Sequence, residues 1–355
     1  MEGNWSSKTR QLIVLAIAIG IFVLNCSDKK QSFYWRMQSQ ATSTSPDFKA
    51  LQVLAKRLET MSNGRFIIDV FPDGEVVAGP DIFRAVKVGE IEMGNGWPNW
   101  WSSQHPAWAV MNAGPFDFMN LDASMMFFLA GPGTDLANEL SAPHGIVWRP
   151  AWWPGMEFGL LSSAPIHGLD DLKDKIVRIG PGLPAEVLAE ASGATTIPLV
   201  PSEIRPALES GQIDAVEWTT ASGVWDLQLH QVAQHALVPA IWQPSVLSDF
   251  LINAEAYEAL PDDLKTMLET AMKAYSLEAT FQGKLADIDS FEKFLDSQIE
   301  VRTWSVEDID RWREANAKII ENYRGADDFS RKFIDEKQNF KKRYNAYGSY
   351  FAPYE

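Results

Sequence analysis

The chain has 355 residues, with 47 acidic and 31 basic side chains and a formal net charge of −16. Nucleic acid and anionic membrane surfaces would repel so acidic a chain, so neither is an expected partner. The length suits two lobes rather than one. Fourteen tryptophans are a large number, and such rings either fill cores or line ligand clefts.

The first segment has the pattern of an export signal. Residues 12–24 form an uninterrupted apolar run preceded by Lys8 and Arg10, which predicts a signal peptide over residues 1–25 because the run is short for a membrane span. The rest of the chain is therefore expected in the periplasm. Cys26, the only cysteine, lies where a lipid anchor would be attached. Asn25 is not the small residue preferred before such a cysteine, so lipidation and an incidental cysteine both stay open.

Strand and helix patterns alternate through the next hundred residues. Strands are expected at residues 33–38, 65–71 and 91–93. Between them, apolar residues at three- and four-residue spacing predict a helix from Asp47 to Asn63-Gly64, and Pro80 begins a second helix. This β-α-β-α-β order predicts a parallel sheet wrapped by helices. We assign residues 26–145 to a first lobe, with later segments crossing back into it.

A second set of such units follows residue 145. It is expected to contain strands at 157–162, 175–179, 196–199 and 213–218, with helices at 184–191 and 203–210. Residues 146–255 are assigned to a second lobe, and a cleft is expected between the two. From Pro261 the pattern is helical, and no proline interrupts residues 262–352. Residues 256–355 are therefore expected to form a helical region that clamps both lobes or reaches a second subunit.

Two strand ends carry charged residues that suggest a ligand site. Arg178 ends the strand 175–179, and Glu217 with Trp218 ends the strand 213–218. Ligands of open α/β sheets bind at the carboxyl ends of strands, and arginine can hold a carboxylate through two hydrogen bonds. The pair predicts a site for a small organic acid. The alternative for Arg178 is an ion pair with Glu186 or a surface acid, whereas Glu217 would be costly to bury without a cation or donor.

Five segments, in this order and spacing, resemble the extracytoplasmic solute receptor of a tripartite ATP-independent periplasmic (TRAP) transporter. They are residues 54–65, 70–72, 85–94, 169–178 and 207–215, and the resemblance covers essentially the whole mature chain. It implies a two-lobed, periplasmic-binding-protein-like α/β fold with a long C-terminal helix. It also implies a receptor that performs no chemistry and hands its solute to a membrane permease driven by an ion gradient.

Glu217-Trp218 followed by Trp242-Gln243-Pro244 resembles the family branch that binds 2-oxo and 2-hydroxy monocarboxylates, such as pyruvate and lactate, with a metal ion. By this resemblance Glu157, Glu217, the Trp218 carbonyl and Gln243 hold the metal, and Arg178 holds the solute. The amide and the carboxylate at positions 157 and 243 have changed places relative to the branch. An all-oxygen set suits Na⁺ or Ca²⁺ rather than transition metals, and the choice between the two stays open. The branch also implies a homodimer that exchanges a helix near residues 262–300.

The remaining candidate site residues have less specific sequence patterns. Of the tryptophans in the loop at residues 96–101, Trp100 is expected to touch the ligand, although aromatic clusters are more often core. Gln38, at the end of the first strand, either donates an amide to the solute or makes a turn hydrogen bond. A surface role for Glu157 and a turn-capping role for Gln243 are the alternatives to metal binding. The five histidines show no metal-binding spacing.

A different class of protein would share several of these features. A secreted glycoside hydrolase would also be acidic and tryptophan-rich, with Glu157 and Glu217 as acid and nucleophile. Arg178 argues against it, because a neighbouring guanidinium favours ionised carboxylates whereas the hydrolase needs one protonated. Serine-hydrolase and nucleotide-binding motifs are absent from the sequence. A sensory receptor of the same fold cannot be told from a transport receptor by sequence.

Overall fold

The computed structural model describes residues 31–112 and 114–351. The chain divides into two compact units, Met1–Phe33 and Tyr34–Glu355. In the first unit, residues 31–33 are described, and Phe33 begins strand β1. The predicted signal peptide and Cys26 lie outside the described residues. No helix in the described part of the chain has the length and apolar character needed to cross a membrane.

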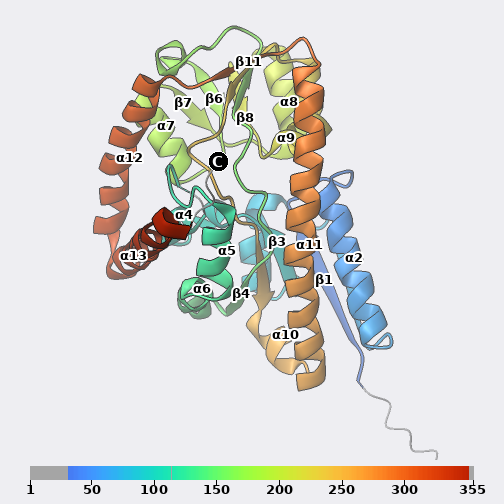
Figure 1. The fold of residues 1–355 in the computed structure, drawn as a ribbon. Coiled ribbons are helices and arrows are strands. Elements are labelled where there is room, and N and C mark those ends of the chain that lie inside the picture. Colours follow the sequence, from blue (N-terminus) through green and yellow to red (C-terminus); the bar gives the residue numbers. More distant parts are fainter. Residues whose placement is uncertain (1–30, 113, 352–355) are drawn as a thin grey trace, which may run out of the picture. The chain divides into compact units, whose positions relative to one another are not determined.

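The described residues form two sheets, and the first has the strand order β2-β1-β3-β10-β4 (Figure 1). β1 and β3 pair in parallel, whereas β10 runs antiparallel to both β3 and β4. The sheet is therefore mixed rather than wholly parallel, because β10 returns from a distant part of the chain and enters between β3 and β4. The strands are β1 (Phe33–Ser39), β2 (Phe66–Phe71), β3 (Met93–Gly96), β4 (Ile146–Pro150) and β10 (Asp249–Asn253).

The second sheet has the order β11-β9-β5-β8-β6-β7. β6 pairs in parallel with both β7 and β8, and Arg178 on β6 is in register with Val216 on β8. The carboxyl ends of β6 and β8 therefore lie at one edge, which brings Arg178 beside Glu217. The strands are β5 (Leu160–Ser162), β6 (Ile176–Arg178), β7 (Thr195–Ile197), β8 (Ala215–Glu217), β9 (His235–Val238) and β11 (Glu300–Thr303).

Short helices connect the strands. In α2 the side chain of Ser45 caps the amino end and Phe48, Leu51, Leu54 and Leu58 form the buried stripe that the sequence predicted. The connecting helices are α2 (Pro46–Met61), α3 (Ile82–Lys87), α4 (Ala107–Met111), α5 (Leu121–Leu129), α6 (Gly133–Ser141), α7 (Leu183–Ser192), α8 (Pro201–Ser210), α9 (Ala221–Asp226) and α10 (Ala254–Ala259).

The C-terminal region is helical, with two interruptions that the sequence did not predict: the strand β11 (Glu300–Thr303) and a break at Asp327. β11 follows the 34-residue helix α11 (Asp262–Leu295) and joins the second sheet beside β9. α12 (Val306–Ala326) then packs against α7, and α13 (Asp328–Phe351) packs against α4 and α5. α11 packs against α2 and against α9, as Figure 1 shows. The lobe boundaries stay a prediction, but β4 and β10 lie in the first sheet and β11 in the second.

The tryptophans divide between the core and two cavities. Six of the tryptophans in the described residues are completely buried, namely Trp101, Trp108, Trp148, Trp153, Trp242 and Trp312. Trp242 stacks on Trp312, with ring centres 5.0 Å apart. Trp97, Trp100, Trp152 and Trp218 line cavities instead. The high tryptophan content therefore serves both roles that composition suggested.

Candidate functional site

Arg178 is held in place by carbonyl and carboxylate oxygens at the edge of the second sheet. Its Nη1 donates to the backbone oxygen of Glu217 at 2.7 Å and to Glu217 Oε2 at 3.1 Å. Its Nε and Nη2 donate to the backbone oxygen of Leu199 at 3.2 and 3.0 Å. A guanidinium has five N–H donors, so one N–H of Nη2 remains available for a ligand. Arg178 and Glu217 are 2% and 3% exposed.

Trp218 covers this ion pair. The guanidinium carbon of Arg178 lies 5.0 Å from the ring centre of Trp218, within the range of a cation–π contact. Gly180, two residues beyond Arg178, donates its backbone N–H to Glu217 Oε2 at 3.2 Å. The Glu217 carboxylate is thus paired with a guanidinium and a backbone amide, which meets the requirement for burying it.

Glu157 and Gln243 are neighbours on connecting segments. The backbone N–H of Glu157 donates to the backbone oxygen of Gln243 at 3.2 Å, and both side chains are buried. Glu157 Oε2 and Gln243 Oε1 have no hydrogen-bond partner among the described residues. Because buried acceptors are nearly always paired in native proteins, two unpaired oxygens at one place indicate room for a ligand or cation.

These residues line one cavity. The structure therefore brings together Glu157, Arg178, Glu217, Trp218 and Gln243, which come from distant parts of the sequence. Trp100 also lines this cavity. The other lining residues are Trp97, Asn99, Asn112, Gly180, Thr219 and Val246.

The cavity contains two carboxyl groups and one guanidinium. Burial raises the pKa of Glu157 well above its usual value, and the charge of Glu217 and a hydrogen bond with it act in the same direction, opposed by Arg178. Burial lowers the pKa of Arg178, against the opposing effect of Glu217 and Glu157. A cation beside Glu157 would favour the ionised form of this carboxyl group. The available atoms are all oxygens, which fits the preference of Na⁺ and Ca²⁺.

The site lacks Gln38, the remaining residue of the predicted set. Its amide nitrogen donates to the backbone oxygens of Ser39 and Pro72, and its amide oxygen accepts from the backbone N–H of Val76 and Val77. These contacts tie β1 to the loop after β2 and leave the side chain fully buried. The solute-donor role for Gln38 is therefore dropped, and the turn hydrogen bonds considered as its alternative are what the structure shows.

Sequence reasoning missed two asparagines at the cavity. Asn112 donates to the side chain of Asn99 at 2.9 Å and accepts from the backbone N–H of Leu247 at 3.0 Å. Asn99 donates to the backbone oxygen of Pro181 at 2.9 Å. Asn99 lies in the tryptophan loop that the sequence singled out, so its position was a usable signal. Asn112 follows a short apolar helix with no feature that marks it.

The fold and the site together define a solute-binding protein: a buried polar cavity lined by the ends of β6 and β8 and by the segment that follows β3, with paired charges and unpaired oxygens. The family of bacterial extracellular solute-binding proteins called DctP, or family 7, matches residues 37–326, and the chain belongs to this family. The resemblance inferred from the sequence is thereby confirmed. The glycoside hydrolase alternative receives no support.

The names of individual relatives and solved structures are more specific than the name of the family. The chain is 27% identical over 309 residues to the monocarboxylate 2-oxoacid-binding periplasmic protein of Nostoc sp. (strain PCC 7120), covering 87% of this chain and 84% of that one. A TRAP solute-binding protein from Pseudoalteromonas atlantica with bound sodium and pyruvate is 25% identical, with a TM-score of 0.86 over 92% of this chain and 100% of that one. Another, from Colwellia psychrerythraea with bound calcium and pyruvate, is 25% identical, with a TM-score of 0.85 over 90% and 98%.

Proposed function

We propose that the protein is a TRAP-transporter receptor that captures a 2-oxo or 2-hydroxy monocarboxylate together with Na⁺ or Ca²⁺ and delivers it to a membrane permease. The observation that carries this proposal is the pair of unpaired buried oxygens, Glu157 Oε2 and Gln243 Oε1, in the same cavity as Arg178. The relatives that bind 2-oxoacids support the choice of solute.

Each residue has a defined role in the proposal. The remaining N–H on Nη2 of Arg178 donates to the solute carboxylate, since the other four N–H groups are used within the protein. Glu157, Glu217, the Trp218 carbonyl and Gln243 supply oxygens to the cation. A bound cation would supply a positive charge for the carboxylate and the 2-oxygen of the solute. Trp100 and Trp218 exclude water from the cavity, which strengthens these charge contacts.

The proposal includes binding without catalysis. Members of the family are solute-binding proteins. It also includes a periplasmic location, in keeping with the family's extracellular proteins and the predicted signal peptide. Attachment through Cys26 stays a prediction.

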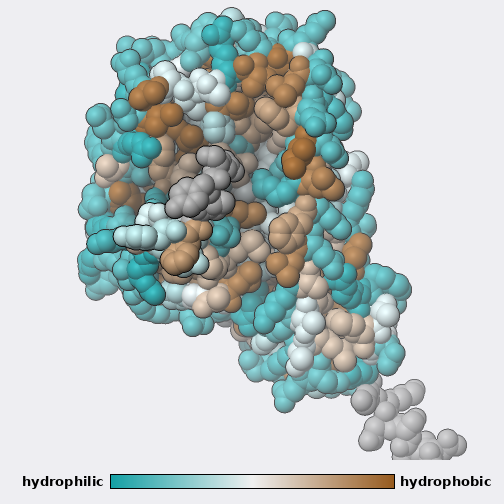
Figure 2. Space-filling view, viewed as in Figure 1, coloured by the Kyte–Doolittle hydropathy of each residue, from teal (hydrophilic) through white to brown (hydrophobic). Residues whose placement is uncertain are grey.

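A homodimer through α11 is part of the same proposal. Leu277, Phe281, Leu285, Ile288 and Leu295 recur along one side of α11 and are exposed. Figure 2 shows hydrophobic patches along the part of this face where α11 runs in Figure 1. Such a stripe on a single helix matches the seam that a second copy of the same helix would cover.

The first test is a thermal-shift screen of metal-stripped protein with pyruvate, lactate, a C4 dicarboxylate and a disaccharide, each with and without Na⁺ or Ca²⁺. A ligand at a hundred times its dissociation constant should stabilise the protein by about 2.7 kcal/mol. Ion-dependent stabilisation by a monocarboxylate supports the proposal. A response to the dicarboxylate alone, without any ion, would remove the metal from it, and a response to the disaccharide alone would overturn it.

A further inference from the structure

A second compartment continues from the site. It is roughly twice as large as the cavity around Arg178. Trp97, Trp218 and Thr219 line both spaces, so the two are adjoining parts of one cleft. A three-carbon acid fills only the smaller space, because the groups that recognise its carboxylate and 2-oxygen all lie there. The larger space is therefore available to a substituent on the solute.

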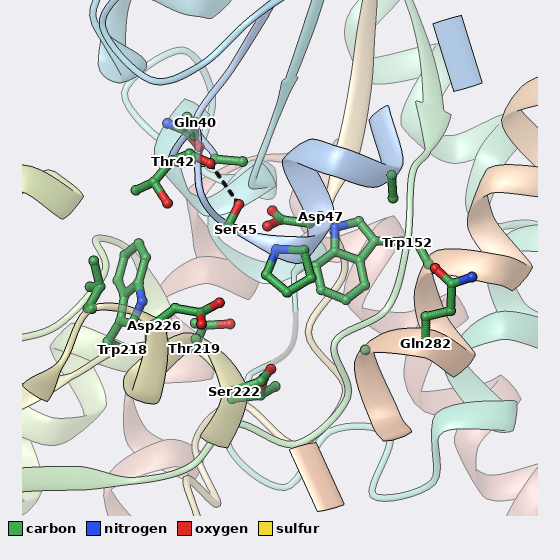
Figure 3. Close-up of a pocket in the computed structure, with 18 of the residues that line it drawn as sticks. Gln40, Thr42, Ser45, Asp47, Trp152, Trp218, Thr219, Ser222, Asp226 and Gln282 are labelled. Atoms are coloured by element: carbon green, nitrogen blue, oxygen red, sulfur yellow. Dashed lines mark hydrogen bonds between the residues drawn. The ribbon is translucent and has the colours of Figure 1, made fainter. Parts of the chain in front are cut away.

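Three tryptophans form the apolar walls of this compartment. The rings of Trp97 and Trp152 lie 6.4 Å apart with a tilt of 54°, and Trp218 lies across the compartment from Trp152 in Figure 3. Gly283 on α11 lets the Trp152 ring lie close to the helix, since a Cβ there would meet that ring at 2.9 Å. Indole faces attract apolar chains and also cations.

The polar lining of the compartment includes two carboxylates. Asp47 and Asp226 both line it, and Figure 3 shows them between Trp152 and Trp218. Among the described residues neither carboxylate forms an ion pair within 4.0 Å, although Lys49 and Lys293 act on Asp226 from further away. Desolvation by burial raises the pKa of Asp47. Hydrogen bonds with Ser45 and the backbone oppose this shift, and the charge of Asp226 makes a smaller contribution that raises the pKa further.

Gln40 lies in the wall of the compartment. Its side chain lines the compartment and is 7% exposed, yet its Oε1 has no hydrogen-bond partner among the described residues. An unpaired buried acceptor calls for a donor. The two carboxylates and three indoles of the compartment disfavour a second carboxylate on the solute and favour a group that is positively charged and donates hydrogen bonds.

We propose that the preferred solute is a 2-oxo or 2-hydroxy monocarboxylate whose side chain crosses the tryptophan-lined compartment and ends in a cationic nitrogen group facing Asp47 and Asp226. This inference rests on the proposed function for the carboxylate end and adds the chemistry of the other end. Aromatic faces and partly exposed carboxylates each contribute modestly to holding a cation. Together they correspond to about a tenfold gain in affinity over a neutral chain of the same length.

The test compares 2-hydroxy acids of equal chain length by isothermal titration calorimetry in the presence of the ion. The ligands are 6-amino-2-hydroxyhexanoate, 2-hydroxyhexanoate and 2-hydroxyadipate, with lactate as the short reference. Hydroxy acids are used because an ω-amino 2-oxo acid closes into a cyclic imine. We expect 6-amino-2-hydroxyhexanoate to bind about tenfold more tightly than 2-hydroxyhexanoate. Of the three six-carbon ligands, 2-hydroxyadipate should bind most weakly.

The double variant Asp47→Asn/Asp226→Asn should bind lactate as before and lose the preference for the amino group. Asp69→Asn, which changes an exposed acid on β2 outside the compartment, is the control and should keep that preference. The inference is overturned if the amino ligand binds no better than 2-hydroxyhexanoate, or if its advantage survives in the double variant. If no 2-hydroxy acid binds, lactate included, the proposed function itself fails.

Discussion

Arg178 and Glu217 are joined twice, because Nη1 of the arginine donates both to the backbone oxygen of Glu217 at 2.7 Å and to its Oε2 at 3.1 Å. The two residues end neighbouring parallel strands. The single guanidinium therefore serves the backbone of β8 and the buried carboxylate at the same time. Its loss would affect the stability of the fold as well as ligand binding.

Arg178→Ala should lower the free energy of unfolding by about 3–5 kcal/mol, because it leaves the buried Glu217 without its cationic partner. Urea denaturation of the ligand-free protein measures the change. Arg84→Ala is the matched control: Arg84 is half exposed and pairs with Glu90 at 3.0 Å, so its loss should cost less than about 1 kcal/mol. Equal midpoints for wild type and Arg178→Ala would contradict the structural role.

Exchanging Glu157 and Gln243 tests the ion site. Glu157→Gln alone leaves one carboxylate in the proposed ligand set, so Ca²⁺ affinity in the presence of pyruvate should fall by about tenfold or more. Adding Gln243→Glu restores two carboxylates and should recover most of that affinity. Titration calorimetry at one fixed pH provides the measurement. If the side chain at position 243 does not face the ion, the double variant will not recover Ca²⁺ affinity. If Glu157→Gln binds Ca²⁺ as tightly as wild type, Glu157 is not a ligand of the ion.

Asp249 should make the protein less stable as pH rises. Its Oδ2 accepts from the indole N–H groups of Trp101 and Trp148 at 3.0 and 2.8 Å, yet burial raises its pKa to about 7. Since the folded state holds this proton more tightly than the unfolded chain, the free energy of unfolding should fall between about pH 4 and pH 7. The expected loss is roughly 4 kcal/mol.

Asp249→Asn keeps an acceptor for both indoles and cannot ionise. The difference in unfolding free energy between this variant and wild type, measured by chemical denaturation at several pH values, isolates the contribution of this one carboxyl group. The free energy of unfolding of the variant should increase relative to that of wild type as pH rises through that range. A difference that does not change with pH would show that Asp249 is ionised in the folded protein at all of these pH values.

Leu285→Glu should disrupt the proposed dimer. Leu285 is 61% exposed near the middle of the apolar stripe on α11, so a charge there would be buried and unpaired in a dimer interface. Sedimentation velocity at micromolar concentration should show a dimer for wild type and for the control Leu285→Met, and a monomer for Leu285→Glu. A monomeric wild type would remove the dimer from the proposal and leave the ligand site untouched.

Much of the fold could be predicted because its signals are local. The apolar spacing of α2 and the β-branched runs of β6 and β8 specify these elements within a few residues. The long-range pairings carry no such signal. β10 enters the first sheet between β3 and β4, and β11 joins β9 after a 34-residue helix. Neither partner choice can be read from the segment itself, because it depends on which sheet edge the folded chain leaves open.

The residues of the site divide in the same way into those with a local sequence signal and those without one. Arg178 and Glu217 stand at strand ends, where pattern and chemistry agree, and the structure places both in the cavity. Glu157 and Gln243 lie on irregular segments, so only the resemblance to a family placed them together. Gln38 had the same pattern as a site residue, being a polar side chain at a strand end. In the structure its amide forms hydrogen bonds with the backbone of the loop after β2. The sequence cannot show whether such an amide binds the backbone or a ligand.

The hydrogen bonds from Arg178 to Leu199 and Glu217 have an entropic consequence. A free arginine side chain carries about 2 kcal/mol of rotamer entropy, which binding would ordinarily remove. Here four N–H groups already have acceptors before any solute arrives, so that freedom is lost when the chain folds. The solute therefore meets a donor with a fixed direction, and a carboxylate that arrives in another orientation gains nothing from a side chain that cannot turn to follow it.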